Sequence, residues 1–310
     1  MKADGRSRRS TLVRALGGFV LALSALAGTL APAAATPALW MARDADSTVY
    51  LFGTFHVLRS GVGWEHEETM NAFLESDDLW LEVDLTTAGG GAGVMSLGTR
   101  PERPLSAALD PADLARVKEA AAELDIPFAT LEPMRPWLAS VMIARKALQR
   151  AGYVSTGPDA VFARLATRTG KPVRGFETSA GQFALFAGLS PEAELSVLRA
   201  SVDEASRSSD YFDTVAAAWV SGDTHTLETR ALDEIRQMGP EVYDTLVTRR
   251  NASMADTIKA VMDGGAGTHF VAVGAAHLIG PDSVQRFLAD AGVPSTRVGA
   301  SGDATGPIAP

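Results

Sequence analysis

Two histidines stand in the same local pattern near opposite ends of the chain. Each follows an apolar, strand-like run in a Gly-x-x-His spacing and precedes two aliphatic residues; the segments are Tyr50–Leu58 and Val271–Ile279. A glycine at a strand end, here Gly53 or Gly274, allows a tight turn or a close backbone approach. The histidine that follows, His56 or His277, is then presented at the sheet edge, where ligands bind in open α/β sheets. Imidazole is the commonest metal ligand and titrates near neutral pH, so this pair indicates metal or acid–base chemistry.

The Gly-x-x-His spacing by itself is not specific, because it occurs four times among the five histidines. We expect His66 to open a helix in an acidic, solvated setting and His225 to lie in a loop that follows a helix. We expect His269, just before a strand, to be structural. Taken singly, His56 or His277 could equally be a buried, hydrogen-bonded core histidine. The context that these two share favours a functional role for them as a pair.

The strands that would position these residues lie mostly at the two ends of the sequence. Two short runs around Asp44-Ala45-Asp46 predict a β-hairpin, and apolar alternation predicts a strand that contains Glu82. The expected strands are Ala38–Arg43, Ser47–Phe52, Leu79–Leu85, Lys171–Phe176, His269–Val273 and Ser295–Val298. Glu82 shares one face of its strand with Trp80 and Asp84.

Helices dominate the middle of the chain, and several begin with a cap residue followed by proline. The expected helices are Trp64–Ser76, one from Asp110-Pro111, Pro136–Arg150, Pro158–Thr169, one from Ser190-Pro191, Ser209–Val220, Pro240–Met262 as one helix or two, and Pro281–Ala291. The glycine-rich stretch Thr86–Gly93 is expected to be a mobile loop. The pattern predicts an α+β or mixed α/β fold, whose central sheet is formed by N- and C-terminal strands around a large helical middle region.

Composition excludes several classes of protein. The chain has 310 residues, is 46% hydrophobic and 21% charged, and has a net charge of −9. It is therefore neither a disordered chain nor a good candidate for binding nucleic acid. It contains no cysteine, so a thiolate metal site, a disulfide and a cysteine nucleophile are excluded, and any metal must be held by histidine and carboxylate. A zincin helix, a G-x-S-x-G nucleophile turn and a phosphate-binding loop are all missing from the sequence.

The first 35 residues have the layout of a secretory signal peptide. A basic start precedes an apolar run from Leu16 to Ala31 and a small-residue end at residues 33–35. Ser7-Arg8-Arg9 is similar to a twin-arginine signal. We expect cleavage and a periplasmic or secreted product that is not bound to a membrane, the alternative being an uncleaved N-terminal anchor. The remainder, residues 36–310, is expected to be a single domain with a helical subdomain at approximately 105–265.

The order of motifs along the chain resembles the TraB/PrgY/GumN family, which includes the Tiki-type proteases. The motifs that carry the resemblance are Tyr50–His56, Ser76–Asp84, Gly157-Pro158-Asp159, Gly175-Phe176-Glu177-Thr178, Arg250-Asn251-x-x-Met254 and Val273–Gly280, and they span nearly all of Leu39–Val298. The resemblance implies two Gly-x-x-His motifs and an acidic residue at a metal-dependent hydrolytic site. It also implies kinship to the erythromycin-esterase-like and the haem-binding ChaN-like folds. Proline before Asp159 and an enlarged glycine loop at 89–93 depart from the family pattern.

With this resemblance, Glu82 is the candidate acid beside His56 and His277. Two imidazoles and a carboxylate suit Zn²⁺, Mn²⁺, Fe²⁺ or Co²⁺ and leave metal positions open for water and substrate. Glu82 could instead be the general base, or it could lie on the solvent-facing side of an edge strand.

Four further residues belong to the same motifs. Arg250 could hold a substrate carboxylate or an oxyanion, or could pair with a surface acid. Asn251 is its helical neighbour. Asp159 is either a helix cap or a partner of the site, and Glu177, at a strand end, is a candidate to support the ligands.

The sequence thus predicts an exported, metal-dependent hydrolase that acts on a peptide or another small molecule. The alternative is a protein of the same fold that binds a peptide, a metal or a haem-like ligand without turnover. No feature of the sequence predicts an oligomeric state.

Overall fold

A computed structural model describes residues 36–86, 91–153, 157–207 and 209–299. The expected signal peptide at 1–35 lies outside these residues. The compact unit that begins at residue 35 is built on one six-stranded sheet with the order β4-β3-β5-β2-β1-β6. The strands are β1 (Leu39–Arg43), β2 (Ser47–Thr54), β3 (Asp78–Val83), β4 (Val173–Glu177), β5 (Gly267–Gly274) and β6 (Ser295–Arg297). The mixed α/β fold and the predicted hairpin of β1 with β2 are confirmed.

The four strands from β4 to β2 are parallel to one another, and this determines where the site forms. β5 pairs with β2 on one side and with β3 on the other, so the C-terminal strand lies between two strands from the N-terminal part of the chain. Thr54 is level with Gly274, and Val83 is level with Glu177. The carboxyl ends of all four strands therefore meet at one edge of the sheet, the edge at which open α/β sheets bind ligands.

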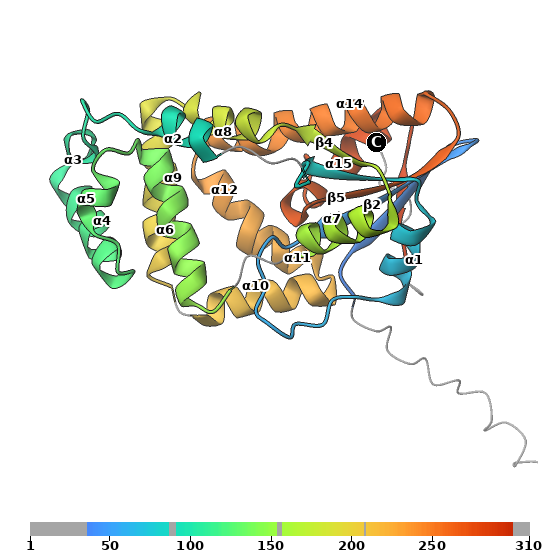
Figure 1. Ribbon diagram of the computed structural model, residues 1–310, viewed down its shortest axis with the longest axis horizontal. Helices are drawn as coiled ribbons and strands as arrows, with labels where there is room; N and C mark the ends of the chain where they lie inside the picture. The colour runs from blue at the N-terminus through green and yellow to red at the C-terminus, as the bar shows by residue number, and fades with distance from the viewer. Residues whose placement is uncertain (1–35, 87–90, 154–156, 208, 300–310) are drawn as a thin grey trace, which may run out of the picture. The chain divides into compact units, whose positions relative to one another are not determined.

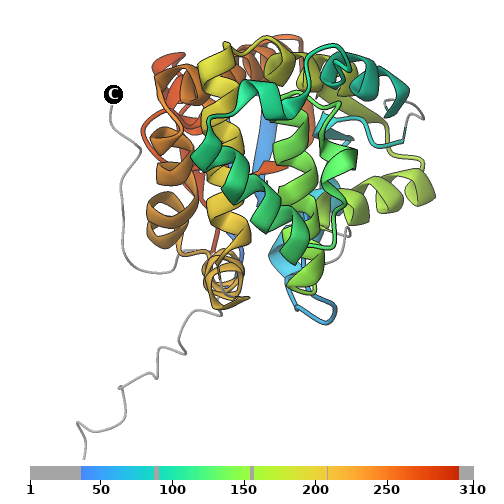
Figure 2. The same ribbon diagram turned by 90° about the vertical axis from the view of Figure 1, so that its left-hand side faces the viewer.

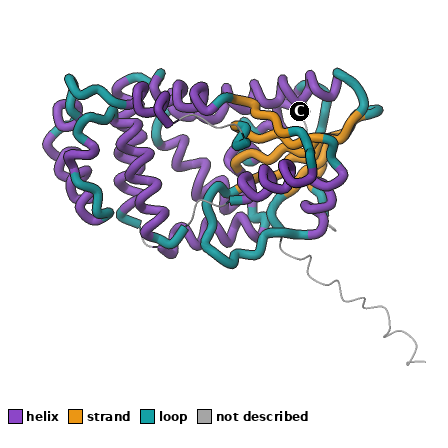
Figure 3. The backbone as a smooth tube through the Cα atoms, viewed as in Figure 1, coloured by secondary structure: helices purple, strands orange, loops and turns teal. Residues whose placement is uncertain are grey.

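Helices pack on both faces of this sheet, which is the orange layer in Figure 3. On one face an aromatic core joins residues of α1, α7 and α10 to the strands, with Phe52, Phe162 and Trp219 at its centre. On the other face α14 and α15 cover a mainly aliphatic core that includes Leu51 and Val271. Parallel strands buried on both faces carry continuous apolar runs, as 49–52 of β2 and 270–273 of β5 do.

The helices follow the predicted order with a few differences. Their bounds are α1 (Glu67–Glu75), α2 (Gly91–Gly98), α3 (Leu105–Ala108), α4 (Pro111–Glu123), α5 (Phe128–Leu131), α6 (Pro136–Arg150), α7 (Pro158–Thr169), α8 (Ser179–Ala187), α9 (Pro191–Ala205), α10 (Ser209–Ser221), α11 (Thr224–Leu227), α12 (Asp233–Gln237), α13 (Pro240–Tyr243), α14 (Arg249–Asp263) and α15 (Val284–Asp290). Two π-helical turns, Glu228–Leu232 and Asp244–Thr248, and a 3₁₀ turn, Ala275–Leu278, complete the set.

Two predictions about local structure are wrong. The end of the expected loop Thr86–Gly93 is helical, because α2 begins at Gly91; residues 87–90 lie outside the described part of the chain. His225 lies within α11 rather than in a loop. The run Pro240–Met262 forms α13, a π-helical turn and α14 in unbroken succession, so the alternative of a single helical run is the better description.

A group of helices without strands packs around its own core. Figure 1 shows α3, α4, α5, α6 and α9 on the side away from the strands, and Figure 2 shows them in front of the sheet. α6 packs along α9, with Trp137, Ile143 and Leu198 fully buried between them and their neighbours. None of the helices in the described ranges is both long enough and apolar enough to span a bilayer.

The end of α9 contains an acid whose ionisation opposes folding. Burial and the nearby charge of Glu234 raise the pKa of Glu204 to about 7, although Arg207 acts in the opposite direction. The folded chain therefore keeps a proton that the unfolded chain has lost between about pH 4.5 and 7. The free energy of unfolding falls across this window as pH rises.

We expect Glu204→Gln to remove this decrease in the free energy of unfolding and to raise that free energy at pH 8 by about 2 kcal/mol. The value is smaller than the pKa shift of Glu204 would give, because the side chain is partly exposed. Urea unfolding at pH 5 and at pH 8 measures the effect. Asp203→Asn is the matched control, since Asp203 pairs with the exposed Arg116. Equal pH dependence in Glu204→Gln and in the unsubstituted chain would contradict the prediction.

Candidate functional site

The structure brings three of the predicted site residues together at the carboxyl edge of the sheet. Glu82 is near the end of β3, His56 follows β2, and His277 lies in the turn that follows β5. The Nε2 atoms of His56 and His277 are 3.7 Å and 3.6 Å from the same oxygen, Oε1 of Glu82. Glu82 and His277 are buried, whereas 61% of the His56 side chain is exposed. One side of the cluster is therefore open to a ligand.

Asn251 fixes the orientation and tautomer of His277. The Asn251 amide nitrogen donates to the carbonyl oxygen of Asp282 at 2.6 Å, so its oxygen faces Nδ1 of His277 at 2.5 Å. An amide oxygen only accepts, so Nδ1 must carry the proton and donate. In the neutral ring Nε2 holds the lone pair, 3.1 Å from a guanidinium nitrogen of Arg250 and 3.6 Å from Oε1 of Glu82. This is the form of imidazole that can bind a metal or accept a proton.

Asp159 holds the other imidazole in the corresponding way. Its Oδ2 lies 3.1 Å from Nδ1 of His56, and its Oδ1 accepts from the hydroxyl of Thr54 at 2.6 Å. Partial burial alone would lower the pKa of His56, but the hydrogen bond and charge of Asp159 and the charge of Glu82 raise it to about 9. In the metal-free protein at neutral pH, His56 is therefore a cation. Its Nε2 proton is directed at the centre of the site.

The Glu82 carboxylate accepts hydrogen bonds from three donors. Its Oε1 accepts from the backbone N–H of Gly274 at 2.8 Å, and its Oε2 accepts from Gln182 at 3.1 Å and from Arg250 at 2.5 Å. Burial would raise the pKa of Glu82, but the two imidazoles and Arg250 hold it well below its usual value. The group is thus a carboxylate at neutral pH.

Arg250 is the cation at the centre of this edge. Its guanidinium pairs with Glu82 and, through Nε at 2.7 Å, with Glu177, and one of its terminal nitrogens lies 3.1 Å from Nε2 of His277. Burial would lower its pKa, yet the charges of the two acids raise it. The alternative of a pair with a surface acid is wrong, because both partners belong to the site.

Two glycines make the convergence of these side chains possible. A Cβ on Gly274 would lie 3.0 Å from Glu82 Oε1 and 3.1 Å from His56 Nε2, in the space where the two side chains meet across the end of β5. A Cβ on Gly53 would lie 3.2 Å from the backbone of Ala275, where the turn that carries His277 crosses β2. Both glycines therefore allow a close approach of backbone to the site.

Gly157, just before α7, packs closely against the backbone of Phe55 and His56. A Cβ at this position would overlap the backbone carbonyl oxygens of Phe55 and His56. We expect Gly157→Ala to lower the free energy of unfolding by about 2–3 kcal/mol, because the packed backbone segments at Gly157 and at Phe55–His56 cannot easily separate. The substitution should also displace His56 from Asp159. Chemical denaturation and the histidine NMR signals measure the two effects. Gly63→Ala is the control, since a Cβ there meets nothing within 4 Å, and equal loss in both variants would contradict the prediction.

Several alternatives left open by the sequence are now decided. β3 is an interior strand and Glu82 is buried, so it does not lie on the solvent face of an edge strand. Asp159 is not a helix cap, because α7 begins after Gly157 without a side-chain cap. His269 pairs with Asp78 at the opposite end of the strands. Sequence reasoning missed Gln182, which lies on an unpredicted helix, and the supporting hydroxyl of Thr54, which stands inside the Gly53–His56 motif.

The donor chemistry of the site fits a divalent transition metal. Two imidazole lone pairs and a carboxylate oxygen are borderline ligands for Zn²⁺, Mn²⁺, Fe²⁺ or Co²⁺. Two ligands bound to one ion at about 2.1 Å are separated by about 3.4–3.6 Å, close to the distances from Glu82 to the two rings. As the side chains stand, no three His, Asp or Glu side chains in the described ranges are arranged to hold an ion, and the Arg250 guanidinium contacts two of the three donors. A metal ion would compete with this cation and displace the His56 proton.

Comparison with known proteins gives one match. The model of the TraB/PrgY/gumN family matches residues 38–297, which include every residue of the site described above. No match was found among the curated proteins or among the solved structures.

Proposed function

The chain belongs to the TraB/PrgY/gumN family, and from that membership and the geometry of its site we propose that it is a metal-dependent hydrolase that cleaves a peptide bond. The observation that carries the proposal is the approach of two imidazole Nε2 atoms to one oxygen of the buried Glu82. Both rings are oriented by an Nδ1 partner, an arrangement characteristic of metal-binding histidines.

Each residue of the cluster has a defined task in this proposal. His56, Glu82 and His277 would hold the ion, and their donor atoms suit Zn²⁺, Mn²⁺, Co²⁺ or Fe²⁺. A bound ion of this kind polarises a carbonyl group and lowers the pKa of water toward neutrality. Asp159 and Asn251 keep the Nε2 lone pairs pointed inward, and Glu177 holds the guanidinium of Arg250 in place.

Arg250 is suited to stabilise the negative charge that develops on the carbonyl oxygen. Its guanidinium is buried, fixed by two carboxylates and adjacent to His277. A preorganised cation in a site with little water stabilises a transition-state charge more strongly than a mobile one does. In a second role for Glu82, its carboxylate would accept a proton from the attacking water rather than bind the ion.

The test combines metal analysis with a peptide library. We expect protein purified without chelator to carry about one equivalent of a transition metal, and His56→Ala/His277→Ala to carry none. His66→Ala/His225→Ala removes the other two Gly-x-x-His histidines and should keep the metal. Metal retained by the first double variant would reject the site. Bound metal without cleavage of any peptide would support a binding protein of this fold instead.

We also propose that the chain is exported to the periplasm or secreted after removal of residues 1–35. The basic start, apolar run and small-residue end support this. The mass of the protein recovered from a periplasmic fraction should correspond to a chain that begins near Thr36, whereas a chain with an intact Met1 recovered only from the membrane fraction would support the anchor.

A further inference from the structure

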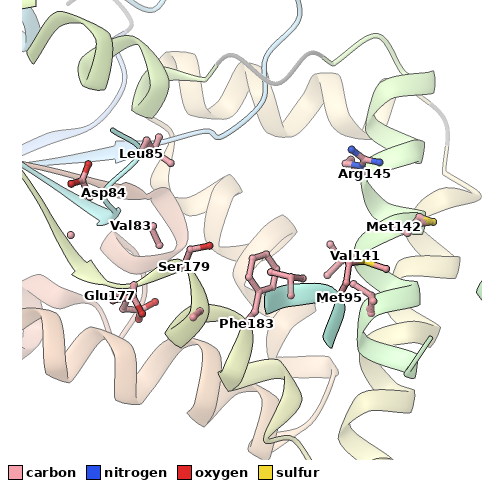
Figure 4. Close-up of a pocket in the computed structure, with 15 residues that line it drawn as sticks. Val83, Asp84, Leu85, Met95, Val141, Met142, Arg145, Glu177, Ser179 and Phe183 are labelled. Carbon is pink, nitrogen blue, oxygen red and sulfur yellow. The ribbon is translucent and has the colours of Figure 1, made fainter. Parts of the chain in front are cut away.

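A large cavity opens beside the His–Glu–His cluster. It has a volume of about 950 Å³ and lies between the ends of β3 and β4 on one side and helices α2, α6 and α8 on the others. Figure 4 shows Val83, Asp84, Leu85 and Glu177 on the strand side, with Val141, Met142 and Arg145 of α6 facing them across the opening. A volume of this size is at the upper end of the range for small-molecule sites.

The cavity adjoins the candidate site. Val83 and Leu85 line both this cavity and a smaller pocket of about 200 Å³ that contains His56, Glu82 and Asp159. Glu177, which also lines the large cavity, is the residue that holds Arg250. A ligand in the cavity would therefore lie beside the His56–Glu82–His277 cluster.

The walls of the cavity are mainly apolar. Phe183 and the thioether side chains of Met95 and Met142 line it, and methionine adapts its shape to irregular apolar ligands. Only three large apolar side chains are exposed in the described ranges, and two of them, Leu85 and Met95, are in this lining. Exposed apolar surface gathered at one place marks a binding surface.

Charge in the cavity is unevenly distributed. Arg145 is the one cationic side chain among the lining residues, and no described residue forms an ion pair or hydrogen bond with it. The acids Asp84 and Glu177 lie on the strand side, and Glu177 is already paired with Arg250. A carboxylate in the cavity would therefore be bound at the α6 wall by Arg145.

The edge strand of the sheet also contributes to the lining of the cavity. Gly175 and Glu177 of β4 line the cavity, and β4 is the edge strand of the sheet, with β3 as its neighbour. An edge strand beside an apolar wall suits an extended peptide, which can use its own backbone hydrogen bonds there. A fatty acid would use the apolar wall and Arg145 but not the strand.

We infer that this cavity binds the portion of a peptide substrate that carries apolar side chains and ends in a free carboxylate, with that carboxylate at Arg145. The inference rests on the proposed peptide hydrolysis and adds the class of peptide. Cleavage would then release short apolar peptides from the carboxyl end of a longer chain.

The test measures binding rather than turnover. Acetyl-Ala-Leu-Phe with a free carboxylate and the same peptide as a carboxamide are titrated by calorimetry into the full protein, kept metal-free with chelator. We expect the acid to bind about tenfold more tightly than the amide. Arg145→Gln should abolish this preference, and Lys146→Gln, the next residue on α6 and not part of the lining, should keep it. Met142→Asp should weaken both peptides tenfold or more, with its folding checked by thermal unfolding.

Each outcome decides the inference separately from the hydrolase proposal. Equal affinity for acid and amide, or a preference that persists in Arg145→Gln, would overturn the inference. Tight, Arg145-dependent binding of decanoate without binding of either peptide would overturn it in favour of a fatty acid. The expected binding pattern without cleavage of any peptide supports the cavity assignment and rejects the hydrolase. Cleavage that does not depend on Arg145 rejects only the cavity assignment.

Discussion

Glu82→Gln is expected to lower kcat/KM for peptide hydrolysis by about 10³-fold, the size of effect that follows when a site loses its proton acceptor or its metal-bound water. Glutamine has nearly the same shape as glutamate but carries no charge, and one of its two terminal atoms is a donor. It would face the Gly274 N–H or the guanidinium of Arg250, both of which donate. Metal content and hydrolysis are measured on the same preparation.

The metal content separates the two roles of Glu82. A variant that has lost both metal and activity identifies a ligand, whereas a variant that keeps metal and loses activity identifies the general base. Glu177→Gln is the matched control, because Glu177 contacts the same guanidinium but not the imidazoles. We expect it to lose about tenfold in kcat/KM, as a change in a supporting residue does. Activity within threefold of the unsubstituted protein in Glu82→Gln would remove Glu82 from the mechanism.

Arg250→Gln is expected to change metal affinity and hydrolysis in opposite directions. The guanidinium competes with a metal ion for His277 Nε2 and Glu82, so its removal should strengthen binding of Mn²⁺ about tenfold or more. It should also lower kcat by about 10²-fold, because the developing oxyanion loses its cation. Titration with Mn²⁺ and steady-state kinetics at saturating metal measure the two effects.

The same substitution should weaken the metal-free fold. Two buried carboxylates, Glu82 and Glu177, would lose their shared cation, and breaking a buried ion pair from one side costs about 3–5 kcal/mol. Arg249→Gln is the control, since this neighbouring arginine is exposed and pairs only with Asp244 among the described residues. Weaker Mn²⁺ binding in Arg250→Gln than in Arg249→Gln would show that Arg250 supports the ion rather than competing with it.

The elements that the sequence predicted well are those with local signals. The caps at Asp110 and Ser190 accept the backbone N–H three residues later, as the Asp-Pro and Ser-Pro pairs indicated. The two strands that precede the Gly-x-x-His motifs lie side by side in parallel register. Both motifs share one pattern, an apolar run followed by a glycine, and this pattern was enough to predict that both histidines lie at one edge of the sheet.

The elements that were missed depend on contacts distant in sequence. α2 is helical despite its glycines because it packs on α8 and α6, and a Cβ on Gly98 would overlap Leu138. α8 is apolar nearly all round and none of its residues is buried, so its sequence lacks the one-sided apolar pattern that predicts a helix. Arg250 and Glu82 are 168 residues apart, and no periodicity in the chain reports that they form a pair.

The place of β5 between β2 and β3 has a consequence for biosynthesis. Until β5 (Gly267–Gly274) and the turn after it have been synthesised, β2 and β3 lack the strand that joins them, and His277 is not yet available. A partly made chain that lacks β5 therefore cannot bring His56, Glu82 and His277 together.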